Sequence, residues 1–233
     1  PTKIAELTDT LGARVPVTSR PLVVIQPITG KRFVTVGSGR FLDSTDVSST
    51  QPQTFYGVID GTSLVFSTPS TLPAGFTFPI PQSKLKQLTD LTVKNLLNPV
   101  TQIGWWYDLG TGAGSLGWRV ISDPTAFYGI VAFAAMLPNG DVCNASGKSR
   151  IFAIDVGLGQ SAIVSGNNTL AYNDAINGVV TDLRWLSVNK PTGGSTLRLM
   201  AGSDKGEIKP IDIRQLTGTG MRRLNWRELP LAD

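Results

Sequence analysis

Side chains able to carry out acid–base or metal chemistry are scarce in this sequence. It contains no histidine, which excludes Ser-His-Asp and Cys-His catalytic arrangements and zinc ligation by histidine. Cys143 is the only cysteine, so neither a disulfide nor a cysteine-based metal cluster can form within the chain, although a cysteine outside it could pair with Cys143. The 17 acidic residues could still supply a carboxylate pair for glycoside hydrolysis, but the sequence alone does not show that any two of them share a cleft. The sequence therefore predicts a protein that is not an enzyme and holds no cofactor of its own.

Two glycine-rich segments have a composition that also occurs in phosphate-binding loops. Residues 37–40 read Gly-Ser-Gly-Arg, and residues 110–114 read Gly-Thr-Gly-Ala-Gly. Neither is followed by Lys-Ser/Thr or by a clear helix whose N-terminus could bind an anion, so both are predicted to be turns. Arg40 precedes an acidic loop, and we expect it to pair with Asp43, with Asp46 or with backbone carbonyls.

Three adjacent aromatic residues form the first candidate for an interaction surface. Because Trp105, Trp106 and Tyr107 follow one another, strand alternation sends Trp106 to the face opposite its two neighbours. Packing between sheets is the structural interpretation of this cluster. The functional interpretation is an aromatic contact surface for a protein or a glycan.

A basic segment near the C-terminus is the second candidate surface. Arg222, Arg223 and Arg227 lie in an alternating pattern in which Leu224 and Trp226 would face inward. This pattern predicts a final outer strand. The strand could lock the C-terminus in place or offer a docking edge to another subunit.

Short strands joined by turns are expected to position all of these residues. The 233-residue chain has 25 glycines, 15 prolines and 16% charged residues, a composition typical of an all-β fold. Residues 83–97 carry leucines at loosely helical spacing, but their threonine and valine content also permits an outer strand, which the surrounding strands favour. The clearest β-rich runs are 21–28, 32–37, 54–59, 129–137, 150–154, 179–186, 196–201 and 207–213.

A repeat emerges when the runs that end in aspartate are aligned. They end at Asp60, Asp108, Asp155 and Asp212, about 50 residues apart, which is the spacing of equivalent strands in four-stranded propeller blades. Chance recurrence among common strand endings is the alternative. About three such units, with a loop-rich insertion around 51–101, account for most of residues 1–233. Since three blades cannot close a ring, the sequence predicts a partial β-propeller that pairs with missing blades or leaves two sheet edges exposed.

Charge and hydropathy exclude two classes of interaction. The formal net charge is +4, from 21 basic and 17 acidic residues that are mostly scattered, which is too sparse for nucleic-acid binding. The longest apolar run, residues 129–137, is far shorter than a membrane span. The chain begins at Pro1 without an initiator methionine or a signal-peptide pattern, and we expect a processed product or a fragment.

Several short motifs occur in a fixed order along nearly the whole chain. They are VGSGRFLDSTDVSSTQPQTFYGVID at 36–60, GWWYDL at 104–109, WRVISDP at 118–124, LPNGDVC at 137–143, RIFAIDVGLGQ at 150–160, LRLMAGSDKGEIKPIDI at 197–213 and RRLNWREL at 222–229. Together they resemble the PilY/PilC family of type IV pilus tip proteins, in the C-terminal part of its β-propeller. The resemblance implies a propeller similar to quinoprotein-type ones. It also implies an exported protein of a Gram-negative bacterium, at the pilus tip, cell surface or outer membrane.

The resemblance implies a role in pili rather than a reaction. In that family the propeller supports pilus assembly and counteracts retraction, and the whole molecule takes part in adhesion and twitching motility. The implied partners are pilins or minor pilins, a host surface, and the missing blades of a longer parent protein. Two alternatives stay open: a purely structural module that carries an N-terminal adhesin domain, and a relic of a quinoprotein-like dehydrogenase.

Two features of that family have no counterpart in this sequence. Its calcium loop reads Asp-x-Asp-x-Asp-Gly, whereas Ser-Thr separates Asp43 from Asp46 and residues 174–178 lack the alternating oxygen ligands. The Arg-Gly-Asp tripeptide of some members is also absent. Calcium is therefore implied for the family but not expected in this chain, and neither is integrin binding.

Overall fold

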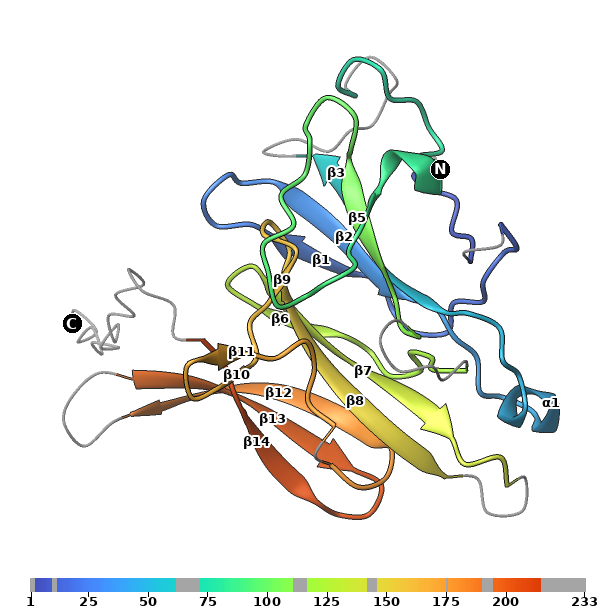
Figure 1. Cartoon of the computed structure of the whole chain (residues 1–233), viewed down its shortest axis with the longest axis vertical. Helices are drawn as coiled ribbons and strands as arrows, with labels where there is room; N and C mark the ends of the chain where they lie inside the picture. Colours follow the sequence, from blue (N-terminus) through green and yellow to red (C-terminus); the bar gives the residue numbers. More distant parts are fainter. Residues whose placement is uncertain are drawn as a thin grey trace, which may run out of the picture.

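The computed structural model describes residues 3–9, 12–61, 72–110, 117–141, 146–174, 176–189 and 195–214. Within them the chain is almost entirely β, with one short helix, α1 (Ser44–Val47), and one 3-10 turn at Gln82–Lys84. Three sheets pack side by side, and the first strands of the three sheets lie close to one another (Figure 1). This arrangement agrees with the all-β fold that the composition predicts.

The strand order within each sheet follows the chain closely. The first sheet has the order β1-β2-β3-β5-β4, the second β6-β7-β8-β9 and the third β12-β13-β14, while β10 and β11 form a separate pair. The β4–β5 pair is parallel and the other named pairs are antiparallel. The bounds are β1 Leu22–Ile25, β2 Arg32–Gly37, β3 Thr54–Gly61, β4 Lys86–Gln87, β5 Gly104–Asp108, β6 Thr125–Phe127, β7 Ile130–Pro138, β8 Gly147–Asp155, β9 Gln160–Ser161, β10 Val164–Ser165, β11 Asn168–Thr169, β12 Val180–Asn189, β13 Ser195–Ser203 and β14 Ile208–Asp212.

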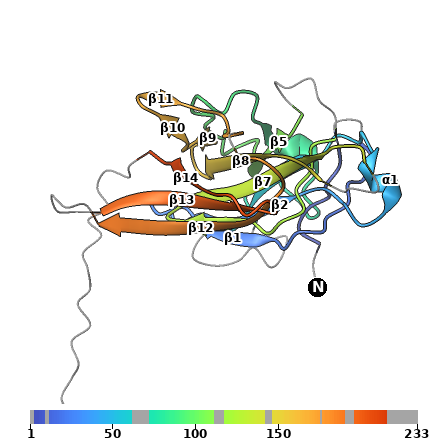
Figure 2. The ribbon, with the colours of Figure 1, turned by 90° about the horizontal axis from the view of Figure 1, so that it is seen from below.

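Strand β7 explains why the three sheets pack together. Its sequence, IVAFAAMLP, is apolar at nearly every position, so both faces of the strand can be buried. Val131, Phe133 and Ala135 pack in one apolar cluster with the first sheet, whereas Ile130 and Ala132 pack in another with the third sheet. The second sheet therefore lies between the other two, as Figure 1 shows, and in the view from below the strands of the three sheets overlap (Figure 2).

Stacked aromatic rings join the first and second sheets. The rings of Phe55 in β3 and Phe133 in β7 lie 3.6 Å apart at their centroids and are nearly parallel, with an interplanar angle of 3°. Phe152 in β8 continues the stack, 4.9 Å from Phe133. All three side chains are buried, and their large apolar area makes this contact a major stabilising feature of the fold.

The repeat of aspartate-ending runs is only partly a repeat of blades. The runs at Asp60, Asp155 and Asp212 end β3, β8 and β14, the third strand of each sheet. The run at Asp108 is β5, the fourth strand of the first sheet, which pairs with β3 on one side and β4 on the other. The prediction that the Asp108 run is the equivalent strand of another blade was wrong. The runs that end at Asp60 and Asp108 are neighbouring strands of one sheet.

The segment between β3 and β5 corresponds to most of the expected insertion. Its leucine-rich part, residues 83–97, is neither a helix nor a long strand: it contains the end of the 3-10 turn, the two-residue strand β4 and irregular loop. Leu85, Leu88 and Leu91 are nevertheless buried against the first sheet's core cluster. The leucine spacing therefore reflects burial of loop side chains rather than a helical face.

The two outer faces of the stack differ. The far face of the first sheet is covered by the chain itself: Tyr56 donates its hydroxyl hydrogen to the carbonyl of Thr8, and Ala5 forms an isolated bridge with Ile80. The far face of the third sheet carries exposed side chains, among them Arg184 and Leu186. The far face of the third sheet is therefore open to solvent at these side chains.

Candidate functional site

The aromatic cluster at Trp105–Tyr107 does not form the expected contact surface. Trp105 and Tyr107 are buried on the face of β5 that meets the second sheet, where the indole Nε1 of Trp105 donates to the carbonyl of Val156 at 2.9 Å. Burial raises the pKa of Tyr107 to about 12. Trp106 lies on the opposite face and is partly buried. The prediction of an aromatic contact surface is therefore wrong for Trp105 and Tyr107. Both pack between sheets, as in the structural interpretation.

Two other features that the sequence singles out lie outside the described residues. They are the C-terminal arginines, Arg222, Arg223 and Arg227, and the single cysteine, Cys143. The predicted docking strand stays a prediction.

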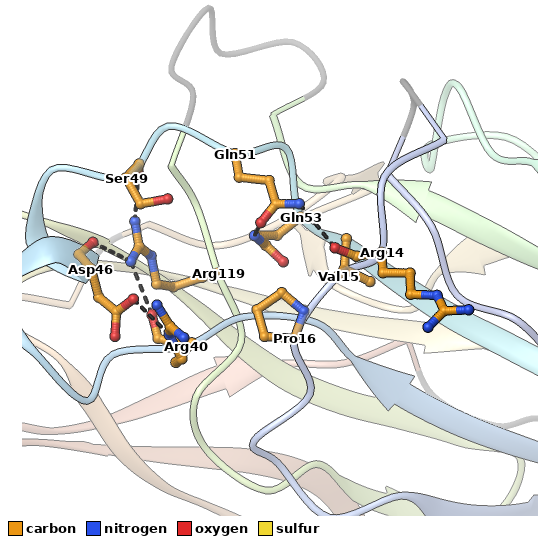
Figure 3. Close-up of a pocket in the computed structure, with 9 residues that line it drawn as sticks. All are labelled: Arg14, Val15, Pro16, Arg40, Asp46, Ser49, Gln51, Gln53 and Arg119. Carbon is orange, nitrogen blue, oxygen red and sulfur yellow. Dashed lines mark hydrogen bonds and ion pairs between the residues drawn. The ribbon is translucent and has the colours of Figure 1, made fainter.

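A polar pocket of about 350 Å³, here called the Arg119 pocket, is the better candidate site (Figure 3). Segments far apart in the sequence meet there: the N-terminal segment, the loop around α1, the approach to β3, and the residues before β6. Its lining residues are Arg14, Val15, Pro16, Arg40, Asp46, Ser49, Gln51, Gln53 and Arg119.

Arg119 organises the wall of this pocket. Its side chain is buried, and its guanidinium donates to four backbone carbonyls: Gly117 at 3.0 Å, Arg40 at 3.0 Å, Asp46 at 2.5 Å and Ser49 at 2.7 Å. Burial lowers the pKa of Arg119, and the nearby negative charge of Asp46 partly opposes this effect. The planar fork of arginine thus ties the loop of residues 40–49 to the residues that lead into β6.

Asp46, which lies in α1 within this loop, is held as an anion. Its carboxylate accepts hydrogen bonds from Arg40 Nε and from the backbone N–H of Leu42, both at 2.8 Å, and from the backbone N–H of Asp43 at 3.2 Å. These contacts, the one from Leu42 first, lower the pKa of Asp46. The predicted pairing of Arg40 with Asp46 is confirmed, and Asp43 lies 3.9 Å from Arg40.

Two glutamines form the opposite wall. The amide nitrogen of Gln51 donates to the carboxylate of Asp9 at 3.2 Å and to the carbonyl of Arg14 at 3.1 Å. Gln51 Oε1 in turn accepts from Gln53 Nε2 at 3.4 Å. This chain of donors fixes the orientation of the Gln53 amide, and its buried Oε1 has no hydrogen-bond donor among the described residues.

A second hollow, of about 640 Å³, lies where β6 approaches β12. Its charged groups are already paired: Arg20 Nη2 lies 2.9 Å from Asp123 Oδ2, and Asp182 Oδ2 lies 2.6 Å from Arg184 Nε. It therefore offers fewer free hydrogen-bonding groups than the Arg119 pocket.

Neither a cluster of metal-binding side chains nor a membrane-spanning helix occurs among the described residues. Among the described residues, no group of three or more His, Cys, Asp or Glu side chains is placed to bind a metal ion. No helix within the described ranges has the length and apolar character needed to cross a bilayer.

Known proteins similar to this chain were found by sequence and by structure. No family model matches the sequence. Two Xylella fastidiosa (strain Temecula1) proteins, each described as a type IV pilus biogenesis factor PilY1 homolog, are 24% identical over 94% of this chain and 27% identical over 65% of it. The solved C-terminal domain of Pseudomonas aeruginosa PilY1 superimposes on 90% of this chain with a TM-score of 0.60 and 20% identity. The chain is PilY1-like.

This result confirms the family resemblance and the β-propeller-like fold class that the sequence predicts. The PilY1-like chain spans 18% and 10% of the lengths of the two Xylella proteins and 47% of the solved domain. Those proteins are therefore much longer than this chain.

Of the residues that line the Arg119 pocket, sequence reasoning singled out only Arg40 and Asp46, and it missed the others, including Arg119 and Gln53. A weak signal exists for Arg119, because it stands between Trp118 and Val120 in a run where alternation predicts buried positions on one face. Its carbonyl partners lie 70 to 79 residues earlier in the chain, except for Gly117, and no sequence pattern connects them.

Proposed function

We propose that this PilY1-like chain is a non-enzymatic part of a type IV pilus biogenesis factor and acts by presenting a protein-binding surface. The observation that carries the proposal is the similarity to PilY1 homologs over 94% of the chain. The matching fold of the PilY1 C-terminal domain supports it.

The chemistry of the Arg119 pocket supports binding rather than catalysis. Arg119 directs its hydrogen bonds to backbone carbonyls, and Asp46 is stabilised in its ionised form, so neither is adapted to exchange protons near neutral pH. In this proposal the chain is exported and works at the pilus tip, cell surface or outer membrane. Its partners are pilins or minor pilins, a host surface and the remaining blades of the parent protein, and it contributes to adhesion and twitching motility.

The test is an in-frame deletion of the segment corresponding to this chain in the bacterium that encodes it. We expect surface pili, measured by shearing and electron microscopy, to fall severalfold, and twitching zones to shrink. Complementation with the full-length gene should restore both. Normal pili with lost attachment would support the structural module that carries an adhesin domain, and normal pili with normal attachment and twitching would contradict the proposal.

A further inference from the structure

The Arg119 pocket contains an incomplete set of hydrogen bonds. Gln53 is buried, with 6% of its surface exposed, and lines the pocket, yet no described residue donates a hydrogen bond to its Oε1. Leaving a buried carbonyl oxygen without a donor is unfavourable, because the oxygen loses its hydrogen bonds to water and gains none in return. In Figure 3 this oxygen lies toward Pro16 and away from Gln51, and because the atom is fully buried, a ligand reaches it only when the Gln53 amide turns toward the pocket. A bound group that supplies an N–H donor at this position would complete the set.

The arginines of the pocket have positive charge and hydrogen-bond donors that the described carboxylates do not fully use. Arg40 is half-exposed and uses its Nε on Asp46, so its terminal nitrogens remain available apart from the 3.9 Å approach of Asp43. The charge of buried Arg119 is surrounded by carbonyls and has no hydrogen-bonded carboxylate among the described residues. The third cation, Arg14, contacts Glu6 at 3.4 Å, and its guanidinium points away from the pocket in Figure 3. The terminal nitrogens of Arg40 therefore favour a hydrogen-bond acceptor from a ligand. A carboxylate matches the planar guanidinium group best.

We propose that the Arg119 pocket binds an acidic side chain on an extended peptide segment of a partner protein. The ligand's carboxylate lies against the terminal nitrogens of Arg40, and an adjacent main-chain N–H donates to Gln53 Oε1 after the buried amide turns toward the pocket. Every residue of a peptide except proline carries this N–H donor beside its side chain. The inference rests on the proposed function, since it names the chemistry of the partner that the presented surface would bind.

The pocket is preformed, which lowers the cost of binding. The four hydrogen bonds from Arg119 hold the loop wall, and the Gln51 contacts to Asp9 and Arg14 hold the other wall. Apart from the turn of the Gln53 amide, little side-chain ordering is then needed when a ligand enters. The volume of about 350 Å³ is at the lower end of the range for ligand sites and suits one or two residues of a peptide.

The test is an NMR titration of the ¹⁵N-labelled 233-residue chain with two synthetic peptides. The probe is acetyl-Gly-Ser-Asp-Ser-Gly-amide, and the comparison peptide carries asparagine in place of aspartate. We expect the aspartate peptide to bind about tenfold more tightly, because a hydrogen bond between charged groups is roughly twice as strong as a neutral one. Chemical-shift changes should concentrate on residues 14–16, 40–53 and 119, and binding should weaken with added salt.

Two variants test the roles of individual residues. Arg40→Gln and Gln53→Leu should each reduce affinity for the aspartate peptide by about tenfold, the first by removing the charge and the second by removing the acceptor. Arg184→Gln is the matched control, since Arg184 is an exposed arginine paired with Asp182 on the third sheet, and it should bind like the wild type. Circular dichroism spectra that match the wild type would show that the variants are folded.

Three results would overturn the proposal: equal affinity for the two peptides, unchanged binding by both pocket variants, or no shift changes at millimolar peptide with the folded chain. Each leaves the proposed function intact if the chromosomal deletion still lowers the amount of surface pili severalfold. Conversely, peptide binding that depends on Arg40 in a chain whose deletion leaves pili, attachment and twitching normal would contradict the proposed function alone.

Discussion

Arg119 is a buried cation that backbone carbonyls solvate, and none of the described carboxylates pairs with it directly. Such an arrangement is costly to break, because removing the guanidinium leaves several carbonyl oxygens without donors in a buried site. Since those carbonyls belong to Arg40, Asp46 and Ser49, the side chain fixes the loop that forms one wall of the pocket. Its role in this structure is therefore positional.

Replacing Arg119 tests that role. We expect Arg119→Met to lower the free energy of unfolding by about 3 kcal/mol, because an apolar chain cannot satisfy the carbonyls. Arg119→Lys should recover only part of this loss, since an ammonium group lacks the planar fork. Urea denaturation followed by tryptophan fluorescence measures both. Arg198→Met, which removes a surface arginine 3.9 Å from Asp212, is the control and should change stability by less than about 0.5 kcal/mol.

At the scale of elements, β3 and β5 pair in a way that depends on one glycine. Gly57 in β3 lies opposite Trp105 in β5, and a Cβ atom at Gly57 would lie 2.6 Å from Cε2 of that indole. The indole cannot move easily, because it is buried and donates to Val156. The first sheet therefore requires glycine at this position for close packing.

Alanine at Gly57 should thus be strongly destabilising. We expect Gly57→Ala to cost about 2 kcal/mol through overpacking. Gly202→Ala is the matched control: that glycine also lies in a strand, β13, but a methyl group added there would meet no atom within 4 Å beyond its chain neighbours, so the substitution should be neutral or slightly stabilising. Thermal melts of both variants give the comparison, and equal melting temperatures would contradict this account of the β3–β5 contact.

The short element α1 and the loop before it couple stability to pH through Asp46. Because its folded-state pKa is lowered, the ionised carboxylate is favoured by folding. It contributes stability above the pKa of the unfolded chain, and this contribution is lost as pH falls through the lower folded-state value. The difference in Tm between the wild type and Asp46→Asn should therefore be full at pH 7 and shrink below about pH 4.

Melts at neutral pH and at two acidic values, one on each side of about pH 4, check this expectation. The control is Asp212→Asn, since the Asp212 carboxylate is exposed and lies 3.9 Å from Arg198, and it should leave Tm nearly unchanged at each pH. A Tm difference for Asp46→Asn that stays constant across this range would show that the carboxylate acts through shape and not through charge.

Particular elements show which features a single sequence can predict. The runs that form β7 and β8 are predictable because each contains a continuous apolar stretch, and turn residues bound both runs. The pairing of Asp108's strand with β3 is not, because pairing depends on contacts across a long insertion and not on local pattern. The Arg119 pocket escapes prediction for the same reason, since Arg40 and Arg119 are 79 residues apart.

At the scale of the whole molecule, the second sheet couples the unfolding of the first sheet to that of the third. Side chains on the two faces of β7 belong to different apolar clusters, one shared with the first sheet and one with the third. Neither outer sheet can bury its inner face without the middle one, so the three should unfold together. This behaviour differs from that of independent domains, which would lose protection separately.

Phe133 offers a way to measure this coupling. Phe133→Ala removes the ring between Phe55 and Phe152 and should cost about 4 kcal/mol, lowering Tm by on the order of 10 °C. Phe133 faces only the first sheet's cluster, yet we expect amide hydrogen exchange to accelerate equally in β3 and in β13, because both report the same global unfolding. The control is Leu186→Ala, an exposed side chain on the third sheet's far face, which should change exchange little in either strand. Faster exchange confined to the first sheet would show that the third sheet is stable without it, and that the stack behaves as a series of separable blades.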